Sequence, residues 1–389
     1  MENIQKKVKK IYSILLVVLV LINLGAFHAS SEEASYPNLN LDCRSAILME
    51  AQTGKILYAN NENEALPPAS VTKVMTLLLV MEAIDEKQIS LTDMVSSSEH
   101  ACSMGGSQIY LEPGEQMSVE DLLKSVVIAS ANDAAVTLAE YVAGTEDSFV
   151  EMMNAKAREL GMENTVFENT NGLDDTTENH VTSAKDIAIM SRELIKHEKI
   201  TEYSRIWMDT IRNGEFGLTN TNRLVRFYKG ATGLKTGSTS KAGFCITATA
   251  ERDGMTLIAV IMASPSRDAR NSAAVALLNY GFSNFTLYEN TADSCEQINV
   301  IKGKSDICRV QETDFYAVID KKHVDKIEKT VEIEDTVVAP IKIGQQIGTV
   351  TYSLNGNIIG TTKIVTAETV ENIGFTDICV RILAKMTLK

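Results

Sequence analysis

The sequence is poor in basic residues, histidine, tryptophan and proline. Among 389 residues, 37 are Lys or Arg against 51 Asp or Glu, which gives a net charge of −14. An acidic surface repels phosphate, so we expect no nucleic-acid partner. The five histidines and six cysteines show no metal-ligand spacing, and the 22 glycines form neither a Walker nor a dinucleotide-binding pattern. The sequence therefore predicts no metal, no nucleotide and no other cofactor.

Long apolar runs are scarce as well, and the first of them marks a targeting segment. Residues 6–10 contain four lysines, residues 11–24 are apolar, and small residues follow at 29–31. This order is typical of a secretory signal peptide, which we place at residues 1–31. An uncleaved membrane anchor is the alternative, but the run is short for a bilayer span. Under either interpretation the remaining chain is exported.

The cysteines are few and widely spaced. They are Cys43, Cys102, Cys245, Cys295, Cys308 and Cys379, and none belongs to a C-x-x-C pair. Export permits disulfides, and Cys295 and Cys308 are close enough in sequence to be a candidate pair. We nevertheless favour the interpretation of all six as small buried apolar side chains.

Residues 35–285 show the mixed pattern of an α/β domain. A strand-like run at 45–50, a Gln-Thr-Gly turn and a second run at 55–58 predict a hairpin. A helix is expected from near Ser70 to Met81, and because it is apolar nearly all round it should be buried. Ser118 and Ser183 are each followed three residues later by Asp, which predicts helix N-caps.

The second half of this segment predicts an Ala-rich helix over 132–142, a helix running from Ser183 toward His197, and then strands. Residues 242–251 and 255–262 are strand-like and are separated by Asp253 and Gly254, a strong hairpin signal. A helix over 269–280 follows. Residues 290–372 are rich in Val, Ile and Thr, with Gly and Asn turns, and predict a small all-β domain.

The last segment, 373–389, predicts an amphipathic helix. Its apolar face consists of Phe375, Ile378, Cys379, Ile382 and Met386, while Arg381, Lys385 and Lys389 lie off that face. This pattern is typical of a helix in a membrane interface. The alternative is a short terminal helix packed on the β-domain.

Three short motifs carry chemistry. In the first, Ser70 and Lys73 are three residues apart, so on a helix the amine can reach the hydroxyl and take its proton. Ser238 and Lys241 have the same spacing, but only Ser70 has a Pro-Pro entry and a buried helix to hold it. Ser70 also lies at the predicted N-terminus of the helix, where the backbone N–H groups and the helix dipole stabilise developing negative charge.

The second motif is Ser130 and Asn132, whose side chains could enter one cleft from a turn. Ser353 and Asn355 repeat the spacing, so this motif is weak alone. The third motif, formed by Lys235, Thr236 and Gly237, occurs once and precedes a predicted strand. A strand with a cation, a hydroxyl and a glycine can lie along a substrate backbone, because glycine permits close approach.

The order S-x-x-K, S-x-N, K-T-G is that of class A β-lactamases and penicillin-binding proteins. Over about residues 40–375 the chain resembles the low-molecular-mass penicillin-binding proteins, the serine-type D-alanyl-D-alanine carboxypeptidases. The resemblance also includes residues 165–173 with His180, residues 233–243, and Arg270 eleven residues before Gly281. It implies a transpeptidase or β-lactamase-like α/β fold, with an antiparallel sheet, flanking helices and a helical subdomain, followed by a small β-domain.

The resemblance implies a role for each motif residue in cleaving D-Ala-D-Ala ends. Ser70 would form an acyl-enzyme, Lys73 would be its base, and Ser130 would pass a proton to the leaving D-Ala. The backbone N–H groups of Ser70 and Ser238 would form the oxyanion hole. Lys73 and Lys235 in one cleft would lower each other's pKa, which suits a lysine base.

The remaining roles concern binding. Asn132 would bond the substrate backbone, Lys235 would tune Ser130, Thr236 and Arg270 would bind the terminal carboxylate, and Gly237 would let the peptide approach. The implied partners are the peptidoglycan stem peptide, β-lactam inhibitors and, through the terminal helix, the membrane surface. The implied location is the outer face of the cytoplasmic membrane or the cell wall.

Two features depart from the family pattern, and two other functions stay open. Ala131 in the second motif should leave its flanking side chains in place, and Ser238 after K-T-G leaves fine substrate preference undecided. Glu168 with Asn169 could belong to a β-lactamase, which hydrolyses its acyl-enzyme quickly. A non-catalytic penicillin-binding sensor is the other alternative. His180 precedes a helix cap, and we interpret it as structural.

Overall fold

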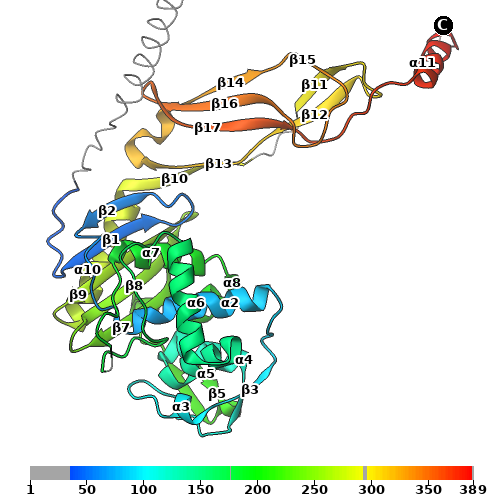
Figure 1. Ribbon diagram of the computed structural model, residues 1–389. Coiled ribbons are helices and arrows are strands. Elements are labelled where there is room, and N and C mark those ends of the chain that lie inside the picture. Colours follow the sequence, from blue (N-terminus) through cyan, green and yellow to red (C-terminus); the bar gives the residue numbers. More distant parts are fainter. Residues whose placement is uncertain (1–35, 176, 292–295, 388–389) are drawn as a thin grey trace, which may run out of the picture. The chain divides into compact units, whose positions relative to one another are not determined.

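The computed structural model describes residues 36–175, 177–291 and 296–387 (Figure 1). The signal segment expected at 1–31 and Cys295 of the candidate disulfide lie outside these residues. The described cysteines are free thiols. Cys245 and Cys308 are buried, as expected for small apolar side chains, whereas Cys43, Cys102 and Cys379 are partly exposed, so the prediction that all the cysteines are buried is wrong for these three. In the described part of the chain, no helix combines the length and apolar character needed to cross a bilayer.

An antiparallel five-stranded sheet forms the centre of the first domain, in the order β2-β1-β9-β8-β7. The strands are β1 (Ser45–Glu50), β2 (Ile56–Asn60), β7 (Ala231–Thr239), β8 (Gly243–Arg252) and β9 (Met255–Ser264). The hairpin expected over 43–60 and the strands on either side of Asp253 and Gly254 are therefore confirmed. The third motif lies on β7, which is an edge strand.

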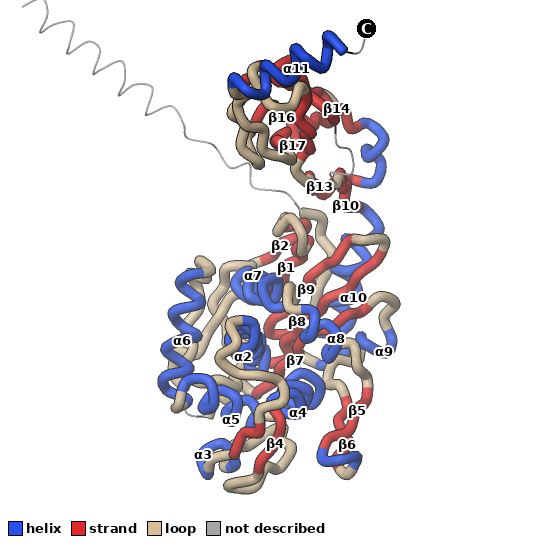
Figure 2. The backbone as a smooth tube through the Cα atoms, turned by 90° about the vertical axis from the view of Figure 1, so that its right-hand side faces the viewer, coloured by secondary structure: helices blue, strands red, loops and turns tan. Residues whose placement is uncertain are grey.

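Helices cover both faces of this sheet (Figure 2). On one face, α7 (Ala184–Leu194) places Ser191 Oγ 2.9 Å from Thr247 Oγ1 of β8. On the other, α10 (Arg267–Asn284) approaches so closely that a Cβ at Gly281 would lie 2.5 Å from Leu257 Cδ1. Thr247 pairs with Val260 of β9, so these two side chains point to the same face of the sheet. Leu257 lies three residues before Val260 on β9, and because side chains alternate along a strand, Leu257 points to the opposite face.

A helical region lies between the first and third motifs in sequence. It contains α2 (Lys73–Asp85), α3 (Glu99–Cys102), α4 (Val119–Lys124), α5 (Asn132–Ala143), α6 (Glu146–Glu159), α7 and α8 (Glu198–Ser204). The predicted caps are confirmed, because Ser118 accepts a hydrogen bond from the Asp121 N–H and Ser183 from the Asp186 N–H. The sequence did not indicate two short two-stranded antiparallel sheets here, β3–β4 (Met94–Ser96 and Gln116–Ser118) and β5–β6 (Met208–Ile211 and Phe216–Thr219).

Three predicted helix boundaries differ from the structure. The helix expected from near Ser70 begins as a 3-10 turn at Ala69–Thr72, and α2 itself starts at Lys73. The helix expected to run toward His197 ends at Leu194. In contrast, α10 is longer than its predicted range of 269–280, because Ser266 caps it by accepting from the Ala269 N–H.

The second domain is all-β, as predicted, except for a 3-10 turn at Lys321–Lys326. One sheet has the order β14-β16-β17-β12-β11-β15, and β10 (Phe285–Asn290) pairs separately with β13 (Phe315–Asp320). The six strands are β11 (Glu296–Ile301), β12 (Ile307–Glu312), β14 (Ile327–Ile333), β15 (Thr336–Val338), β16 (Gln346–Leu354) and β17 (Asn357–Thr366). In the core of this domain, the ring of Tyr352 stacks on the ring of Phe315, with the two ring centroids 3.9 Å apart. The chain ends in α11 (Phe375–Thr387).

The buried helix α2 should contribute much of the stability of the first domain. Met75 on α2 is fully buried, so Met75→Ala should lower the free energy of unfolding by about 2–5 kcal/mol through lost burial and a residual cavity. Met152→Ala on α6 is the matched control, since Met152 is 37% exposed. Denaturant unfolding measures both variants, and equal losses would contradict this assignment of the core.

Candidate active site

The first motif forms a serine–lysine pair at the start of α2. Ser70 lies in the 3-10 turn, after Ala69 with a φ of 50°. Lys73 follows one turn later, and its Nζ is 3.0 Å from Ser70 Oγ. The lysine is fully buried, and Nζ also donates to the carbonyl oxygen of Asn171 at 2.7 Å. The amine is therefore held toward the serine hydroxyl.

The second and third motifs meet at Ser130. This residue has a left-handed backbone, with φ 66° and ψ 29°, between a π-helical turn at Ser125–Ala129 and α5. Lys235 on β7 donates to Ser130 Oγ at 2.8 Å and to the Thr236 carbonyl at 3.2 Å, and the lysine is 1% exposed. A cation therefore lies directly behind the second serine.

Asn132 faces the same site from the first turn of α5. Its Nδ2 donates to the Gly105 carbonyl at 2.6 Å, while Oδ1 is buried and has no partner among the described residues. The adjacent Asp133 accepts from the N–H groups of Ile109 and Leu111, so the segment 105–111 is fixed against this motif. The amide oxygen of Asn132 is thus a buried hydrogen-bond acceptor that is not yet used.

Gly237 lets β7 approach the nucleophile turn. A Cβ at this position would lie 2.8 Å from both the Pro68 carbonyl oxygen and the Ser70 backbone nitrogen, so any side chain would displace one of the two segments. Thr236 and Ser238, on either side, line the same pocket as Ser70. The glycine was expected to let a substrate backbone approach β7, which stays a prediction; in the structure it permits the contact of β7 with residues 68–70.

The pocket at these motifs has a volume of about 490 Å³. It is lined by Ser70, Ser107, Ser130, Trp207, Thr219, Asn220, Thr221, Arg223, Thr236, Gly237, Ser238, Arg267 and Arg270. Lys73, Asn132 and Lys235 lie behind its wall. All nine residues predicted from the sequence therefore gather at one place. Trp207, Thr221, Arg223 and Arg267 were missed, because no short motif contains them.

Three basic side chains share this site, and burial lowers the pKa of each of them. Burial, followed by the charge of Lys235, lowers the pKa of Lys73 well below its usual value, against the opposing effect of Asp133. Burial and then Arg270 lower the pKa of Lys235 to about 7. Burial and then Arg267 lower the pKa of Arg270 to about 10. Of the mutual lowering expected for the two lysines, the effect of Lys235 on the pKa of Lys73 is present, whereas the charge that lowers the pKa of Lys235 is that of Arg270 and not that of Lys73. Burial is the larger cause for each lysine.

Arg270 and Thr236 both line the pocket and are suited to an anion. The Arg270 guanidinium donates to Asn271 Oδ1 at 2.9 and 3.1 Å, and Arg270 is only 3% exposed. Thr236 Oγ1 donates to Thr221 Oγ1 at 2.9 Å. Guanidinium and hydroxyl groups in the lining of a pocket favour a carboxylate ligand.

The repeated motifs elsewhere in the chain do not build a second site. Lys241 Nζ donates to the Asp174 carbonyl at 2.7 Å, whereas Ser238 lies on β7. Ser353 and Asn355 belong to the end of β16 and the turn after it. Glu168 does not line the pocket, because its carboxylate accepts from the N–H groups of Glu178 and Asn179.

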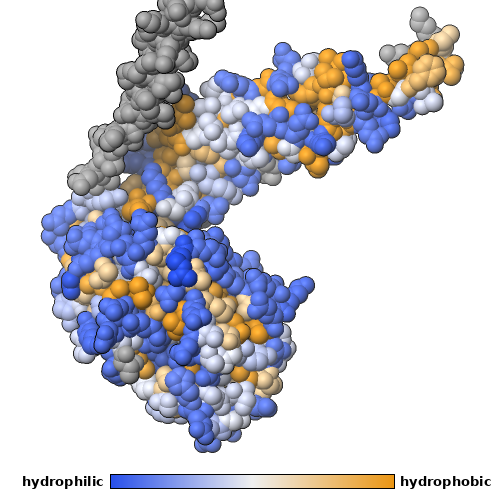
Figure 3. Space-filling model, in the orientation of Figure 1, coloured by the Kyte–Doolittle hydropathy of each residue, from blue (hydrophilic) through white to orange (hydrophobic). Residues whose placement is uncertain are grey.

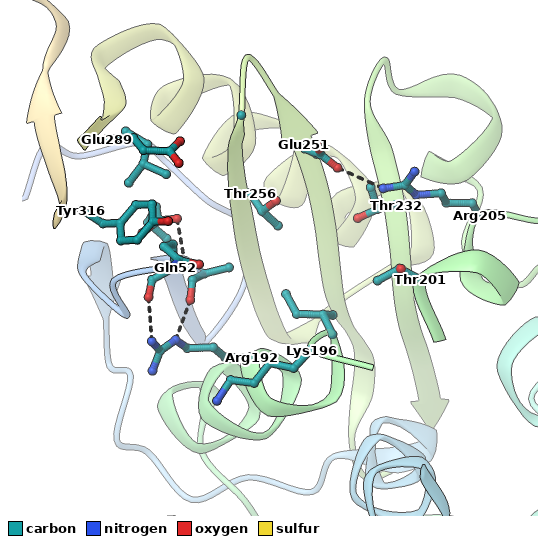
Figure 4. A pocket seen from close by; sticks show the side chains of 15 residues that line it. Gln52, Arg192, Lys196, Thr201, Arg205, Thr232, Glu251, Thr256, Glu289 and Tyr316 are labelled. Atoms are coloured by element: carbon teal, nitrogen blue, oxygen red, sulfur yellow. Dashed lines mark hydrogen bonds and ion pairs between the residues drawn. The ribbon is translucent and has the colours of Figure 1, made fainter. Parts of the chain in front are cut away.

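A larger pocket, of about 690 Å³, lies elsewhere and is lined by residues such as Arg192, Arg205, Thr232 and Glu251 (Figure 4). Its charged groups are already engaged: Arg192 Nε donates to the Ala51 carbonyl, and Arg205 forms an ion pair with Glu251 at 3.0 Å. No serine lines this pocket. The serine–lysine pair therefore belongs to the smaller pocket and not to this one.

Comparison with known proteins agrees with this geometry. The family described as D-alanyl-D-alanine carboxypeptidase matches residues 30–266, and the penicillin-binding protein 5 C-terminal domain matches 282–372. The chain is 40% identical to the D-alanyl-D-alanine carboxypeptidase DacF of Bacillus subtilis (strain 168), over 94% of this chain and 96% of that protein.

Solved structures are similar as well. Penicillin-binding protein 5 from Haemophilus influenzae has a TM-score of 0.74 at 31% identity, covering 87% of this chain and 99% of that one. Penicillin-binding protein D2 from Listeria monocytogenes, in its ampicillin-bound form, has a TM-score of 0.58 at 32% identity, covering 63% of this chain and all of that one.

His180, beside the site, should make stability depend on pH. Burial lowers its pKa from 6.5 to about 4, against the opposing effects of Glu168 and Asp174. Between these values the unfolded chain binds a proton that the folded chain does not, so stability is full above pH 6.5 and is lost as pH falls toward 4. The loss should total roughly 3 kcal/mol.

Denaturant unfolding, followed by the single tryptophan, Trp207, should reveal this loss when wild type is compared with His180→Gln at pH 7 and pH 4.5. Because glutamine does not titrate, the stability difference between the two proteins should shift toward the variant at the lower pH. A difference that is the same at both pH values would contradict a neutral buried histidine.

Proposed function

Since the chain belongs to the D-alanyl-D-alanine carboxypeptidase family, we propose that Ser70 is the nucleophile that removes the terminal D-Ala from peptidoglycan stem pentapeptides. The observation that carries this proposal is the buried Lys73 Nζ, 3.0 Å from Ser70 Oγ in the wall of the pocket. A lysine with a lowered pKa is a competent base for a serine hydroxyl at neutral pH.

Acylation then follows from the positions of the remaining groups. Lys73 takes the Ser70 proton while Oγ attacks the carbonyl carbon of the penultimate D-Ala. The backbone N–H groups of Ser70 and Ser238 stabilise the oxyanion, which the close approach at Gly237 supports. Ser130 Oγ, held by Lys235 at 2.8 Å, gives a proton to the leaving nitrogen and regains one from Lys73. Water later releases the shortened peptide.

Substrate orientation rests on two contacts at opposite sides of the reacting bond. The terminal carboxylate binds Arg270 and Thr236, where Arg223 and Arg267 add positive charge. The unpartnered Asn132 Oδ1 accepts an N–H from the peptide backbone on the acyl side. The carboxylate contact requires a free C-terminus, which fits carboxypeptidase action.

A β-lactam that acylates Ser70 should stay bound, because none of the described residues that line the pocket has a carboxylate side chain to activate the hydrolytic water. Glu168, the candidate from the β-lactamase alternative, is engaged by backbone N–H groups. The comparisons support the carboxypeptidase interpretation and not the β-lactamase or sensor alternatives.

Incubation of the purified ectodomain with benzylpenicillin should give a long-lived mass adduct on the Ser70 peptide of wild type. Ser70→Ala should give none, because the alternative serine–lysine pair at Ser238 is not assembled. Mass spectrometry of the intact protein and its peptides makes this measurement, with Ser238→Ala as the matched serine control, which should still acylate. Rapid drug loss without an adduct would instead indicate a β-lactamase.

We further propose that α11 associates with the membrane surface and that residues 1–31 direct export. The apolar residues Phe375, Ile382 and Met386 are 81, 55 and 72% exposed, and the helix appears as an apolar surface in Figure 3. On the polar side of the helix, Arg381 forms an ion pair with Asp306 at 2.7 Å. An outward apolar face suits a lipid interface better than packing on the β-domain.

Sedimentation with anionic lipid vesicles should separate these two alternatives for α11. Phe375→Glu combined with Ile382→Glu should abolish binding of the mature protein, whereas Ile358→Glu, at a 69%-exposed position on β17, should not. Equal binding by all three proteins would overturn the membrane proposal.

Mass spectrometry of protein secreted from a bacterial host should place the mature N-terminus near residue 32; an intact N-terminus would contradict the signal peptide.

A further inference from the structure

His180 is linked to the nucleophile turn through one buried hydroxyl. Thr72 Oγ1 is 2.7 Å from His180 Nε2 and donates to the Ala69 carbonyl oxygen at 2.8 Å. Thr72 is fully buried and His180 is 6% exposed, so water cannot readily replace these bonds. A chain of two hydrogen bonds therefore joins the histidine to the residue before Ser70.

The direction of these bonds follows from the second ring nitrogen. The backbone N–H of Glu168 donates to His180 Nδ1 at 3.0 Å, so Nδ1 carries no proton and accepts. The proton of the neutral ring is then on Nε2, which donates to Thr72 Oγ1. This bond leaves the threonine hydroxyl proton free to point at the Ala69 carbonyl.

The Ala69 carbonyl belongs to a strained turn that needs such support. Ala69 has a φ of 50°, a left-handed conformation that costs a residue with a Cβ free energy. On its other side the carbonyl meets Gly172, where an added Cβ would lie only 1.9 Å from the oxygen and 2.8 Å from Thr72 Oγ1. The turn is thus held between Thr72 and the segment that contains Gly172.

The same segment holds the base. The Asn171 carbonyl oxygen accepts a hydrogen bond from Lys73 Nζ at 2.7 Å, and the Thr170 carbonyl oxygen accepts one from Thr76 Oγ1 at 2.5 Å. His180 ends this segment, and its ring packs edge-on against Phe167, 5.8 Å away. Residues 170–172 and His180 therefore contact the nucleophile turn and the first turns of α2.

We propose that His180 is a positioning residue for acylation: its Nε2–H orients the Thr72 hydroxyl, which holds the Ala69 carbonyl and so fixes the turn that presents Ser70 to Lys73. The histidine touches neither the substrate nor the reacting atoms. It acts through Thr72 on the geometry of the serine–lysine pair. This proposal rests on the proposed role of Ser70 as nucleophile.

The test measures the rate constant of acylation separately from the fraction of working sites. A fluorescent penicillin in stopped flow gives the second-order rate constant, and the amplitude of labelling gives the active-site titre. Thr72→Val, which keeps the shape and removes the hydroxyl, should lower the rate constant about 10- to 100-fold at an unchanged titre, as expected for a small displacement of a catalytic group. Thr72→Ser should recover most of that loss.

The histidine is tested in the same assay. His180→Phe should slow acylation as Thr72→Val does, and His180→Gln, whose amide can still donate, should slow it less. The double variant Thr72→Val with His180→Phe should be no slower than the slower single variant, because both remove one connected path. His197→Phe is the matched control; His197 pairs with Asp85 away from the pocket, so the rate constant should not change.

Three results would overturn the proposal. They are a wild-type rate constant in Thr72→Val, losses of titre alone, and losses that multiply in the double variant. Should His180→Phe fail to fold, the Thr72→Val and Thr72→Ser pair still decides the outcome. Failure of the proposed function is distinguishable, because it would appear as the absence of any adduct on Ser70 of the wild-type protein.

Discussion

The catalytic domain is organised around two lysine amines that are removed from water in one cleft. Lys73 and Lys235 are 0 and 1% exposed, and burial is the largest cause of the lowered pKa of each. Burying an ammonium group is costly unless it finds partners or loses its proton. Each amine therefore has a serine oxygen and a backbone carbonyl within reach, and those partners come from the 3-10 turn at Ala69–Thr72, β7, Ser130 and residue 171.

Rigid support of these partners explains several features outside the motifs. Gly237 and Gly172 are positions where backbone meets backbone around the nucleophile turn, and no side chain fits at either. Asp133 fixes the segment that carries Ser107 and the Gly105 carbonyl, and Thr72 holds Ala69 in its left-handed conformation. The strain of that turn is maintained because neighbours on both sides determine it.

Prediction from the sequence succeeded where a residue's role depends on its near neighbours. The spacing of Ser70 and Lys73 predicts their contact, because a helical turn brings residues three apart together. Ser118 and Ser183 predict caps for the same reason, and Asp253 with Gly254 predicts a hairpin. The β-domain followed from its Val, Ile and Thr content. The boundaries of α2, α7 and α10 were less accurate, because the ends of these helices depend on tertiary contacts.

The sequence analysis also missed those groups of the site that belong to no local sequence pattern. Trp207, Thr221 and Arg223 line the pocket, yet they belong to no short motif and reach it through the fold of residues 204–224. The Asn171 carbonyl that holds Lys73 is a backbone group, so no residue type indicates it. His180 was interpreted as structural because it precedes a helix cap, and its contact with Thr72, 108 residues away, is not visible in the sequence.

By itself, the sequence determined the family, the α/β domain followed by a small β-domain, and the nine side chains that gather at the site. These depend on residue type and on spacings of a few positions, which short-range geometry converts into contact. The tertiary structure decided which serine–lysine pair is assembled, how far the lysine pKa values fall and which carbonyls hold them. Those properties depend on desolvation and on contacts between segments far apart in the chain, and both exist only once the chain has folded.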